Sequence, residues 1–488
     1  MSGLTRAFAL FTGASFIGTI TQVVKGKITA VVLGPDGVGV LNQLTNTLQF
    51  LGSLAGLGFY NGMVRHMAEA WSRDDMARFR SHFRASAIVM MGAALATAAV
   101  TVLARSAISD FIFVDGGARA HLVALGAIAV PLAVACQVHR ALINATRSVG
   151  LLVRCRIVAD VGSVVLLAAL IFPLGVEGAV LAFVGLHGLF LVATFVAIRS
   201  ITRLRAQPAP QTPVFQASEV RKNLAFGLNA FLALAIGTGT LILASRLVIA
   251  TFDTAANGIF TMALKVGTVF LGGVTAAAAG YLIPTMSAAR DDVELHGHTN
   301  EALRLYSYFL PVIIVGLMAG GDLLILVFFT AEFLPAAALL LLILPGELLR
   351  VYCETLTVPL ITRKRFVPAT GTYLLWSVVY LGGAIVLIEP LGLTGVATAY
   401  LASLALRFVL TLWISRTVSG HRLDGDTARA VLLAVVLVAT AALVLRLAPT
   451  RLLDYLACTG LLAVWLGLSM FDPAFRSLLE ATRRKLVR

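Results

Sequence analysis

Fourteen apolar stretches, most of them about twenty residues or longer, occupy this chain and leave only short connections between them. Hydrophobic residues make up 59% of the 488 residues and charged residues only 13%, which excludes a water-soluble globular fold. In lipid every backbone group needs a partner, and no alternating strand pattern is present, so the spanning elements must be helices. We predict an all-α polytopic membrane protein with about fourteen transmembrane helices. The predicted spans are 5–33, 38–66, 84–107, 119–144, 155–173, 177–200, 223–250, 255–283, 303–329, 333–361, 367–388, 392–416, 428–447 and 451–471.

The positive charges sort by membrane side. The chain has 38 Lys and Arg residues and a formal charge of +14, and most of these residues fall in loops on the side of the N-terminus. The loops of the opposite side hold only Arg105, Arg119, Arg446 and Arg451. This asymmetry is the positive-inside bias and predicts cytoplasmic N- and C-termini. The clusters of Lys and Arg are therefore better explained as determinants of membrane topology than as a binding site for a polyanion. We expect no nucleic-acid partner.

Neither metal chemistry nor catalysis is indicated by the sequence. The four cysteines, Cys136, Cys155, Cys353 and Cys458, are scattered without CxxC or Cys/His spacing, so no disulfide framework or metal site is expected. No phosphate-binding loop, HExxH sequence or nucleophile elbow is present, and no loop is large enough for an active site. We expect no cofactor and no enzymatic activity. Without an ATPase motif, a transporter of this kind would depend on ion or substrate gradients.

An internal duplication relates the two halves of the chain. Residues 171–183 match residues 388–400 at a spacing of 217, including Pro, Leu and two Gly. Six helices per copy make the copies parallel repeats. We predict an N-lobe of helices 1–6 (1–205), an inter-lobe linker (206–221), a C-lobe of helices 7–12 (222–420), and an added region with helices 13–14 and a basic cytoplasmic tail (421–488). Between the second and third spans, Trp71–Phe83 is either an interfacial helix or a solvated connector.

Cations occupy equivalent intramembrane positions in the two copies. Aligning Gly39 with Gly258 places Lys27 opposite Arg246, and the second copy adds Lys265 in its next helix. Intramembrane charge is costly, so such side chains face a cavity or a partner, although snorkelling or a salt bridge is an alternative. Separated cations at this depth suit a pyrophosphate. We predict Lys27, Arg246 and Lys265 as pyrophosphate ligands, with Lys25 as a weaker candidate because it points to another side of its helix.

Polar stripes accompany these cations. Asn42, Asn46 and Gln49 share one helical face, and Thr261, Lys265 and Thr268 share another. These faces supply the hydrogen bonds that a sugar needs, but polar stripes also hold membrane helices together, and the sequence leaves both interpretations open. We predict the Asn, Gln and Thr residues of both stripes as saccharide-binding, cavity-lining residues.

Acidic residues form a separate group. Glu347, Arg350 and Glu354 are spaced three and four apart, which predicts a ladder of alternating charges on one helical face. We favour a structural role for this ladder over ion coupling. We expect Asp322 and Asp160 to have no oppositely charged partner nearby in the sequence. They are therefore candidate proton or cation sites.

Two local motifs carry a family resemblance. Leu33-Gly-Pro-Asp-Gly-Val-Gly-Val-Leu-Asn-Gln43 is followed by Gly56-Leu-Gly-Phe-Tyr-Asn-Gly-Met-Val-Arg65 with Ala68-Glu69. This pattern resembles the polysaccharide-transporter branch of the multidrug/oligosaccharidyl-lipid/polysaccharide (MOP) exporter superfamily, the Wzx-type O-antigen and lipid-linked oligosaccharide flippases. The resemblance covers essentially the whole chain. It also makes Asn61 a candidate saccharide-binding residue.

The resemblance implies two six-helix lobes that work by alternating access in the bacterial inner membrane. It implies a lipid-linked oligosaccharide substrate, undecaprenyl pyrophosphate carrying a saccharide whose head group crosses while the prenyl tail stays in the membrane lipids. Coupling to H+ or Na+ and contact with a polysaccharide polymerase, in lipopolysaccharide or O-antigen synthesis, are further expectations.

Other functions remain open. A purely structural scaffold is one of them, although it would leave the equivalent intramembrane cations unexplained. A cation-coupled multidrug antiporter of the same superfamily would need carboxylates in its cavities, whereas the candidates here are mostly basic. A flippase for lipid II, the peptidoglycan precursor, would share the helix plan and the cations. A membrane polymerase or ligase would need a large outer loop, and the longest one here, near 108–118, is short.

Overall fold

The computed structural model describes residues 3–56, 58–201, 217–447 and 451–470, and all the regular elements in these ranges are helices. Ten helical spans among them are long and apolar enough to cross a membrane. The all-α polytopic prediction is confirmed. The elements are α1 (Gly3–Gly56), α2 (Phe59–Ser72), α3 (Met76–Leu103), α4 (Arg105–Phe113), α5 (Ala120–Ala127), α6 (Ala129–Ala145), α7 (Val149–Arg199), α9 (Ala217–Thr251), α10 (Thr254–Ala288), α11 (Asp292–Ala319), α12 (Gly321–Phe328), the 3-10 turn η1 (Ala331–Phe333), α13 (Ala336–Thr362), α14 (Phe366–Leu391), α15 (Leu393–Ser419), α16 (Gly425–Leu447) and α17 (Arg451–Met470).

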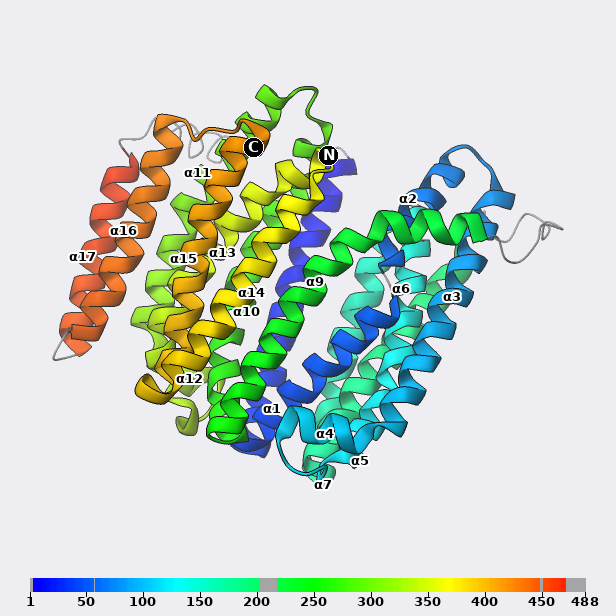
Figure 1. Cartoon of the computed structure of the whole chain (residues 1–488), viewed down its shortest axis with the longest axis horizontal. Coiled ribbons are helices and arrows are strands. Elements are labelled where there is room, and N and C mark those ends of the chain that lie inside the picture. Colours follow the sequence, from blue (N-terminus) through cyan, green and yellow to red (C-terminus); the bar gives the residue numbers. More distant parts are fainter. Residues whose placement is uncertain (1–2, 57, 202–216, 448–450, 471–488) are drawn as a thin grey trace. The chain divides into compact units, whose positions relative to one another are not determined.

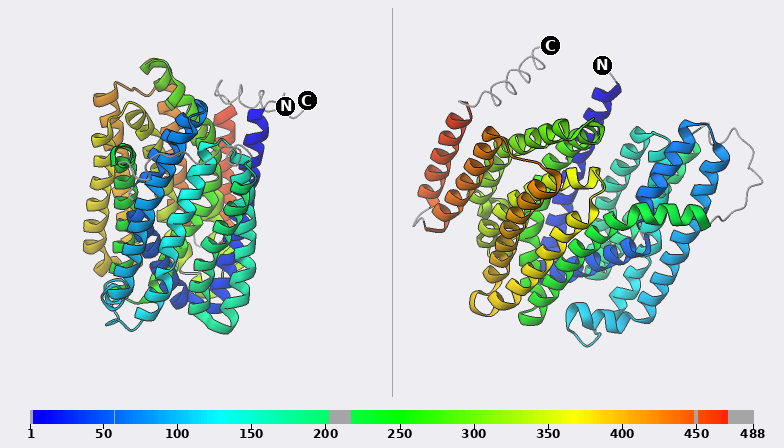
Figure 2. Two further views of the ribbon diagram at one scale, coloured as in Figure 1. Left: turned by 90° about the vertical axis from the view of Figure 1, so that its right-hand side faces the viewer. Right: turned by 45° about the horizontal axis from the view of Figure 1, so that its top comes forward.

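Two of the helices, α1 and α7, extend over more than one predicted span: α1 covers 5–33 and most of 38–66, and α7 covers 155–173 and nearly all of 177–200. α1 bends at Gly34, where φ is 61°, and α7 bends at Gly175, where φ is 57°. Both φ values lie in the left-handed region, which glycine enters without steric cost. Pro35 then begins the second half of α1 with a φ already suited to a helix. The two halves of α7 run side by side as a hairpin (Figures 1 and 2).

The repeated motif makes the same tight corner in both copies. Gly392, which ends α14, has a φ of 61° and is the equivalent of Gly175. Three residues later, a Cβ added to Gly178 or to Gly395 would lie 2.0 Å from a backbone carbonyl oxygen of the preceding helix. The paired glycines therefore serve backbone geometry, one for the turn and one for the close approach of the two helices.

Several predicted boundaries differ from the structure. The span 38–66 is broken because Gly58, at φ 71°, lies between the end of α1 and the start of α2. The span 303–329 is divided between α11 and α12, and the span 119–144 between α5 and α6. Trp71–Phe83 is not a separate interfacial helix. Asp75 caps α3 by accepting the Arg78 amide at 2.9 Å, so the segment is divided between α2, a turn and α3.

Two compact units make up the chain. The first comprises Met1–Thr261 with Phe328–Glu332, and the second comprises Met262–Val327 with Phe333–Arg488. The core of the first unit lies among α1, α2, α3, α6 and α7, and in the second α13 is the most deeply buried span. The predicted linker 206–221 lies outside the described residues up to position 216, as does the basic tail from position 471. The lobe boundaries taken from the repeat stay a prediction.

Candidate functional site

Helices α1 and α10 touch backbone to backbone within the first unit. A Cβ on Gly39 would lie 1.8 Å from the Thr254 oxygen, and a Cβ on Gly258 would lie 2.0 Å from the Pro35 oxygen. Gly39 is the repeat equivalent of Gly258, and Pro35 is the equivalent of Thr254, at a spacing of 219. The contact therefore has local two-fold symmetry, and each half of it requires glycine.

Polar side chains complete this crossing. The Asn42 amide donates to the Thr261 hydroxyl at 3.0 Å, and these two residues are again repeat equivalents. One turn away, the Asn257 amide donates to the Gly39 carbonyl at 3.2 Å. Asn42 and Thr261 are only 3% and 5% exposed. Two predicted saccharide ligands thus contact each other inside a helix–helix interface, where they hold α1 against α10.

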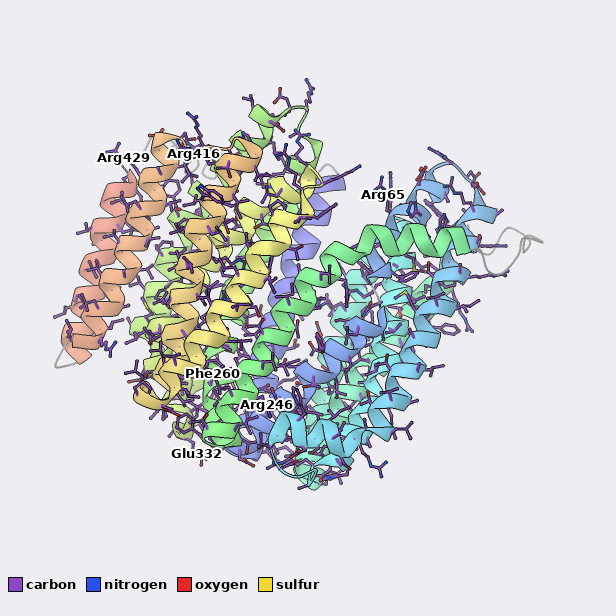
Figure 3. The ribbon with its side chains drawn as sticks, viewed as in Figure 1. Arg65, Arg246, Phe260, Glu332, Arg416 and Arg429 are labelled. Carbon is purple, nitrogen blue, oxygen red and sulfur yellow. The ribbon has the colours of Figure 1, made fainter. Side chains whose placement is uncertain are left out.

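Lys27 and Arg246 are both half-buried and both reach backbone carbonyls. The Lys27 ammonium donates to the carbonyl of Phe329, directly after α12. The Arg246 guanidinium, on the C-terminal part of α9 (Figure 3), donates to the carbonyl of Phe111 in α4 at 2.7 Å. Arg246 also lies over the Phe111 ring, 5.0 Å from its centroid. Carbonyls at a helix C-terminus lack intrahelical donors and carry partial negative charge, so both cations are well placed electrostatically.

Lys25 faces a different helix from Lys27. Its ammonium donates to the Ser163 hydroxyl of α7 at 3.2 Å. Asp160, one turn earlier on α7, pairs with Arg156 at 3.4 Å. The expectation that Asp160 lacks a partner near it in the sequence is therefore wrong, because Arg156 lies four residues before it, one turn away on the same helix face.

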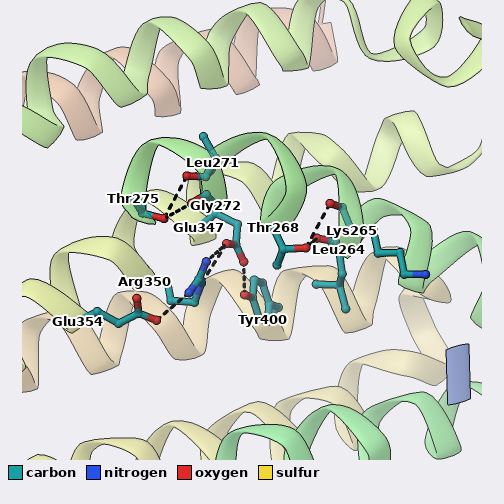
Figure 4. Close-up of polar contacts among 10 residues, drawn as sticks. All are labelled: Leu264, Lys265, Thr268, Leu271, Gly272, Thr275, Glu347, Arg350, Glu354 and Tyr400. Atoms are coloured by element: carbon teal, nitrogen blue, oxygen red, sulfur yellow. Dashed lines mark hydrogen bonds and ion pairs between the residues drawn. The ribbon is translucent and has the colours of Figure 1, made fainter. Parts of the chain in front are cut away.

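The other predicted cavity residues are more accessible. Asn46 is half-buried, whereas Gln49, Asn61, Lys265 and Thr268 are exposed. The Thr268 hydroxyl donates to carbonyls of its own helix, at 3.2 Å each. The Lys265 side chain extends away from the acidic group on α13 (Figure 4). An exposed polar face on a membrane helix is unsuited to lipid contact, which keeps these residues as candidates for a polar path.

The Glu347 ladder is present as predicted and has a further member. Arg350 donates through Nε and Nη2 to Glu347 at 2.9 and 2.6 Å, and through Nη1 to Glu354 at 2.6 Å (Figure 4). The Tyr400 hydroxyl of α15 donates to the other Glu347 oxygen at 2.5 Å. Glu347 is 1% exposed, and Gly267 of α10 leaves room for it, since a Cβ there would lie 2.9 Å from the Glu347 side chain. This burial and pairing indicate a structural group that joins α13 to α15.

Three functional or structural side chains escaped the sequence analysis. Gln43 is fully buried, and its amide donates to the carbonyls of Ile112 and Ile242 at 3.3 and 3.2 Å. Arg407 is 2% exposed, with its guanidinium 3.8 Å from the centroid of the Tyr373 ring. Tyr400 was noted only as part of the repeat. An arginine in an apolar span was a usable signal for Arg407, whereas nothing local distinguishes Gln43 from its neighbour Asn42.

The sequence of this chain is similar to those of known polysaccharide and lipid-linked sugar proteins. The family model described as polysaccharide biosynthesis protein matches residues 28–338. The lipid III flippase of Escherichia coli (strain K12) is 26% identical over 313 residues, covering 62% of this chain and 72% of that protein. The same figures hold for the lipid III flippase of Shigella flexneri.

Solved structures share the fold. The lipid II flippase MurJ in an inward closed conformation has a TM-score of 0.73 at 14% identity, over 99% of both chains. An inward-facing multidrug resistance MATE family transporter of the MOP superfamily has a TM-score of 0.68 at 13% identity, over 85% of this chain and 98% of the other. The family model covers more than half of the sequence. The chain therefore belongs to the polysaccharide biosynthesis protein family.

Proposed function

We propose that this protein is a flippase that carries an undecaprenyl-pyrophosphate-linked oligosaccharide from the cytoplasmic to the outer leaflet of the bacterial inner membrane. The observation that carries the proposal is the pair of intramembrane cations, Lys27 and Arg246, at equivalent positions of two repeats in a chain of this family. The flipped saccharide would serve surface polysaccharide export, with O-antigen as one such product. The similarity to lipid III flippases supports a lipid-linked sugar as the substrate class.

Fixed cations address the main physical obstacle to this reaction. A pyrophosphate crossing about 30 Å of hydrocarbon would lose its hydration, which costs far more than thermal energy supplies. Lysine and arginine replace hydrating water by charge-assisted hydrogen bonds that are strong in a medium of low dielectric constant. We assign the pyrophosphate to Lys27, Arg246 and Lys265. Lys25 is left out of this assignment, because its ammonium donates to Ser163 of α7. The accessible residues Asn46, Gln49, Asn61 and Thr268 are then the candidate saccharide contacts.

Lipid II is the second candidate substrate. The fold of this chain matches that of a lipid II flippase over nearly its whole length. Lipid II also carries a pyrophosphate, so the same cations would serve it. A multidrug antiporter is less well supported, because the carboxylates of the ladder are already bound to Arg350 and Tyr400.

The direction of transport and its partners belong to the proposal. The asymmetric distribution of Lys and Arg supports cytoplasmic termini. Coupling to H+ or Na+, with Asp160 or Asp322 as the binding group, and cooperation with a polysaccharide polymerase stay predictions.

The test is a flipping assay in proteoliposomes with three fluorescent cargoes, namely an undecaprenyl-pyrophosphate oligosaccharide, lipid II and a lipophilic cationic dye. The proposal predicts rapid flipping of the first cargo and slower flipping of the second. Preferential movement of lipid II would transfer the assignment to peptidoglycan synthesis. Movement of the dye alone would overturn the proposal in favour of drug export.

A further inference from the structure

Lys27 and Arg246, which occupy equivalent positions in the two repeats, each contact a residue of the other repeat. Lys27 belongs to the first repeat and donates to Phe329, which belongs by sequence to the second repeat. Arg246 belongs to the second repeat and donates to Phe111 in the first repeat. All four residues lie in the first compact unit. Each acceptor stands at the end of the short helix, α4 or α12, that follows the third long helix of its repeat.

Both contacts are built in the same way. Each cation meets a C-terminal carbonyl, where the helix macrodipole places its negative end. A phenylalanine ring lies near each contact. The Phe111 ring lies under the Arg246 guanidinium, and the Phe329 ring packs beside Gly26, the neighbour of Lys27, 3.2 Å from its Cβ position. Neither cation meets a carboxylate in these contacts. The acceptors are therefore neutral groups, which an anion can outcompete.

We propose that the carbonyls of Phe111 and Phe329 are resting ligands that the substrate's pyrophosphate displaces, so that one event binds the substrate and releases the ends of α4 and α12. The proposal rests on the proposed function and adds its regulation. Phosphate oxygens carry more negative charge than carbonyl oxygens, so Lys and Arg bind phosphate more strongly than they bind a backbone carbonyl. That difference in affinity is what a ligand needs to shift a conformational equilibrium.

Displacement has a reciprocal consequence. If pyrophosphate loosens the two contacts, then the contacts oppose pyrophosphate binding by the same free energy. An empty protein stays latched at α4 and α12, and an anion that binds the two cations unlatches them. A monophosphate offers fewer oxygens over a shorter span and is expected to be the weaker trigger.

The test is hydrogen–deuterium exchange of the full-length protein in nanodiscs, read by mass spectrometry at residues 105–113 and 321–329. Without ligand, Arg246→Gln should speed exchange in α4 about tenfold, and Lys27→Gln should do the same in α12. Lys25→Gln is the matched control, because Lys25 lies on the same helix but donates to a serine of α7, and it should leave both segments unchanged.

Addition of undecaprenyl pyrophosphate then completes the test. In the wild type it should speed exchange in both segments, more than undecaprenyl phosphate does, and it should add little to α4 in Arg246→Gln. Unchanged protection in both ligand-free variants would overturn the latch, whatever the flipping assay reports. If the variants loosen but pyrophosphate leaves the wild type protected, the displacement is wrong, and only the flipping assay then decides whether the protein is a flippase.

Discussion

Intramembrane cations are satisfied differently in the two compact units. In the first unit, Lys27 and Arg246 donate to neutral backbone carbonyls. In the second unit, Arg350 is bound between two carboxylates, so its positive charge is already neutralised by ion pairs. Basic residues inside the membrane therefore have two different roles in this protein. A cation with a carbonyl partner can change ligands at low cost, whereas a cation in a buried ion pair fixes the packing of helices.

The largest expected effect on stability comes from removing a charge in the second unit. It tests whether the group of Glu347, Arg350 and Glu354 has a structural role. Glu347→Ala leaves Arg350 with one exposed partner and removes the acceptor of Tyr400, so the free energy of unfolding should fall by about 3–5 kcal/mol. Thermal or chemical unfolding in detergent would measure this loss. Glu354→Ala is the matched control, because the Glu354 side chain is 43% exposed, and it should cost about 1 kcal/mol or less. Equal losses in the two variants would show that burial is not what makes the ladder strong.

The repeated glycines should behave alike in the two units, in contrast to the cations. Gly178→Ala and Gly395→Ala each force a methyl group against a backbone carbonyl 2.0 Å away, and each should destabilise the protein by about 1–3 kcal/mol. Gly382→Ala, where the space around the Cβ position is open, should be neutral or slightly stabilising because alanine favours the helix. If only one of the first two variants is destabilised, the two corners are not equivalent.

A neutral polar contact in the second unit gives a smaller, pH-dependent effect. His421, in the connection between α15 and α16, bonds to Asn300 at 3.0 Å and to Ser415 at 3.2 Å. Burial, helped by the charge of His296 and opposed by Asp424, lowers the pKa of His421 to about 4. The unfolded chain takes up the proton near pH 6.5. The stabilising contribution is therefore complete above pH 6.5 and is lost as the pH falls from there toward 4.

The predicted loss of stability at low pH can be checked by measuring the free energy of unfolding at pH 7 and pH 5. The wild type should lose about 1–2 kcal/mol at the lower pH from this residue, and His421→Asn should lose correspondingly less over the same interval. An equal loss in the variant would assign the pH dependence to other groups.

The apolar spans, the repeat and the carboxylate ladder could be predicted because each is a pattern in the sequence itself and does not depend on which helices pack together. Glu347, Arg350 and Glu354 lie within two turns of one helix. The equivalence of Gly175 with Gly392 follows from the repeated sequence motif that contains them. The partners of the polar side chains could not be predicted. Lys27 and Phe329 lie 302 residues apart, and helical periodicity shows that a face is polar without showing what it meets.

Polar stripes illustrate the same limit. Asn42 and Gln49 were grouped on one face, yet Asn42 is buried against Thr261 while Gln49 is exposed. The difference arises because Gly39 brings α10 against the first turns of that helical segment, and a close backbone approach of this kind depends on tertiary packing.

Lys27 and Arg246, the carbonyl-bound cations of the first unit, are assigned here to the pyrophosphate of the substrate. The most direct test measures the flipping rate of the undecaprenyl-pyrophosphate oligosaccharide in proteoliposomes that contain wild type, Lys27→Gln, Arg246→Gln or Lys25→Gln protein at equal, folded amounts. If the assignment is right, Lys27→Gln and Arg246→Gln should each slow flipping by about tenfold or more, while Lys25→Gln stays close to wild type. Unimpaired flipping in both of the first two variants would contradict it and leave these cations a structural role only.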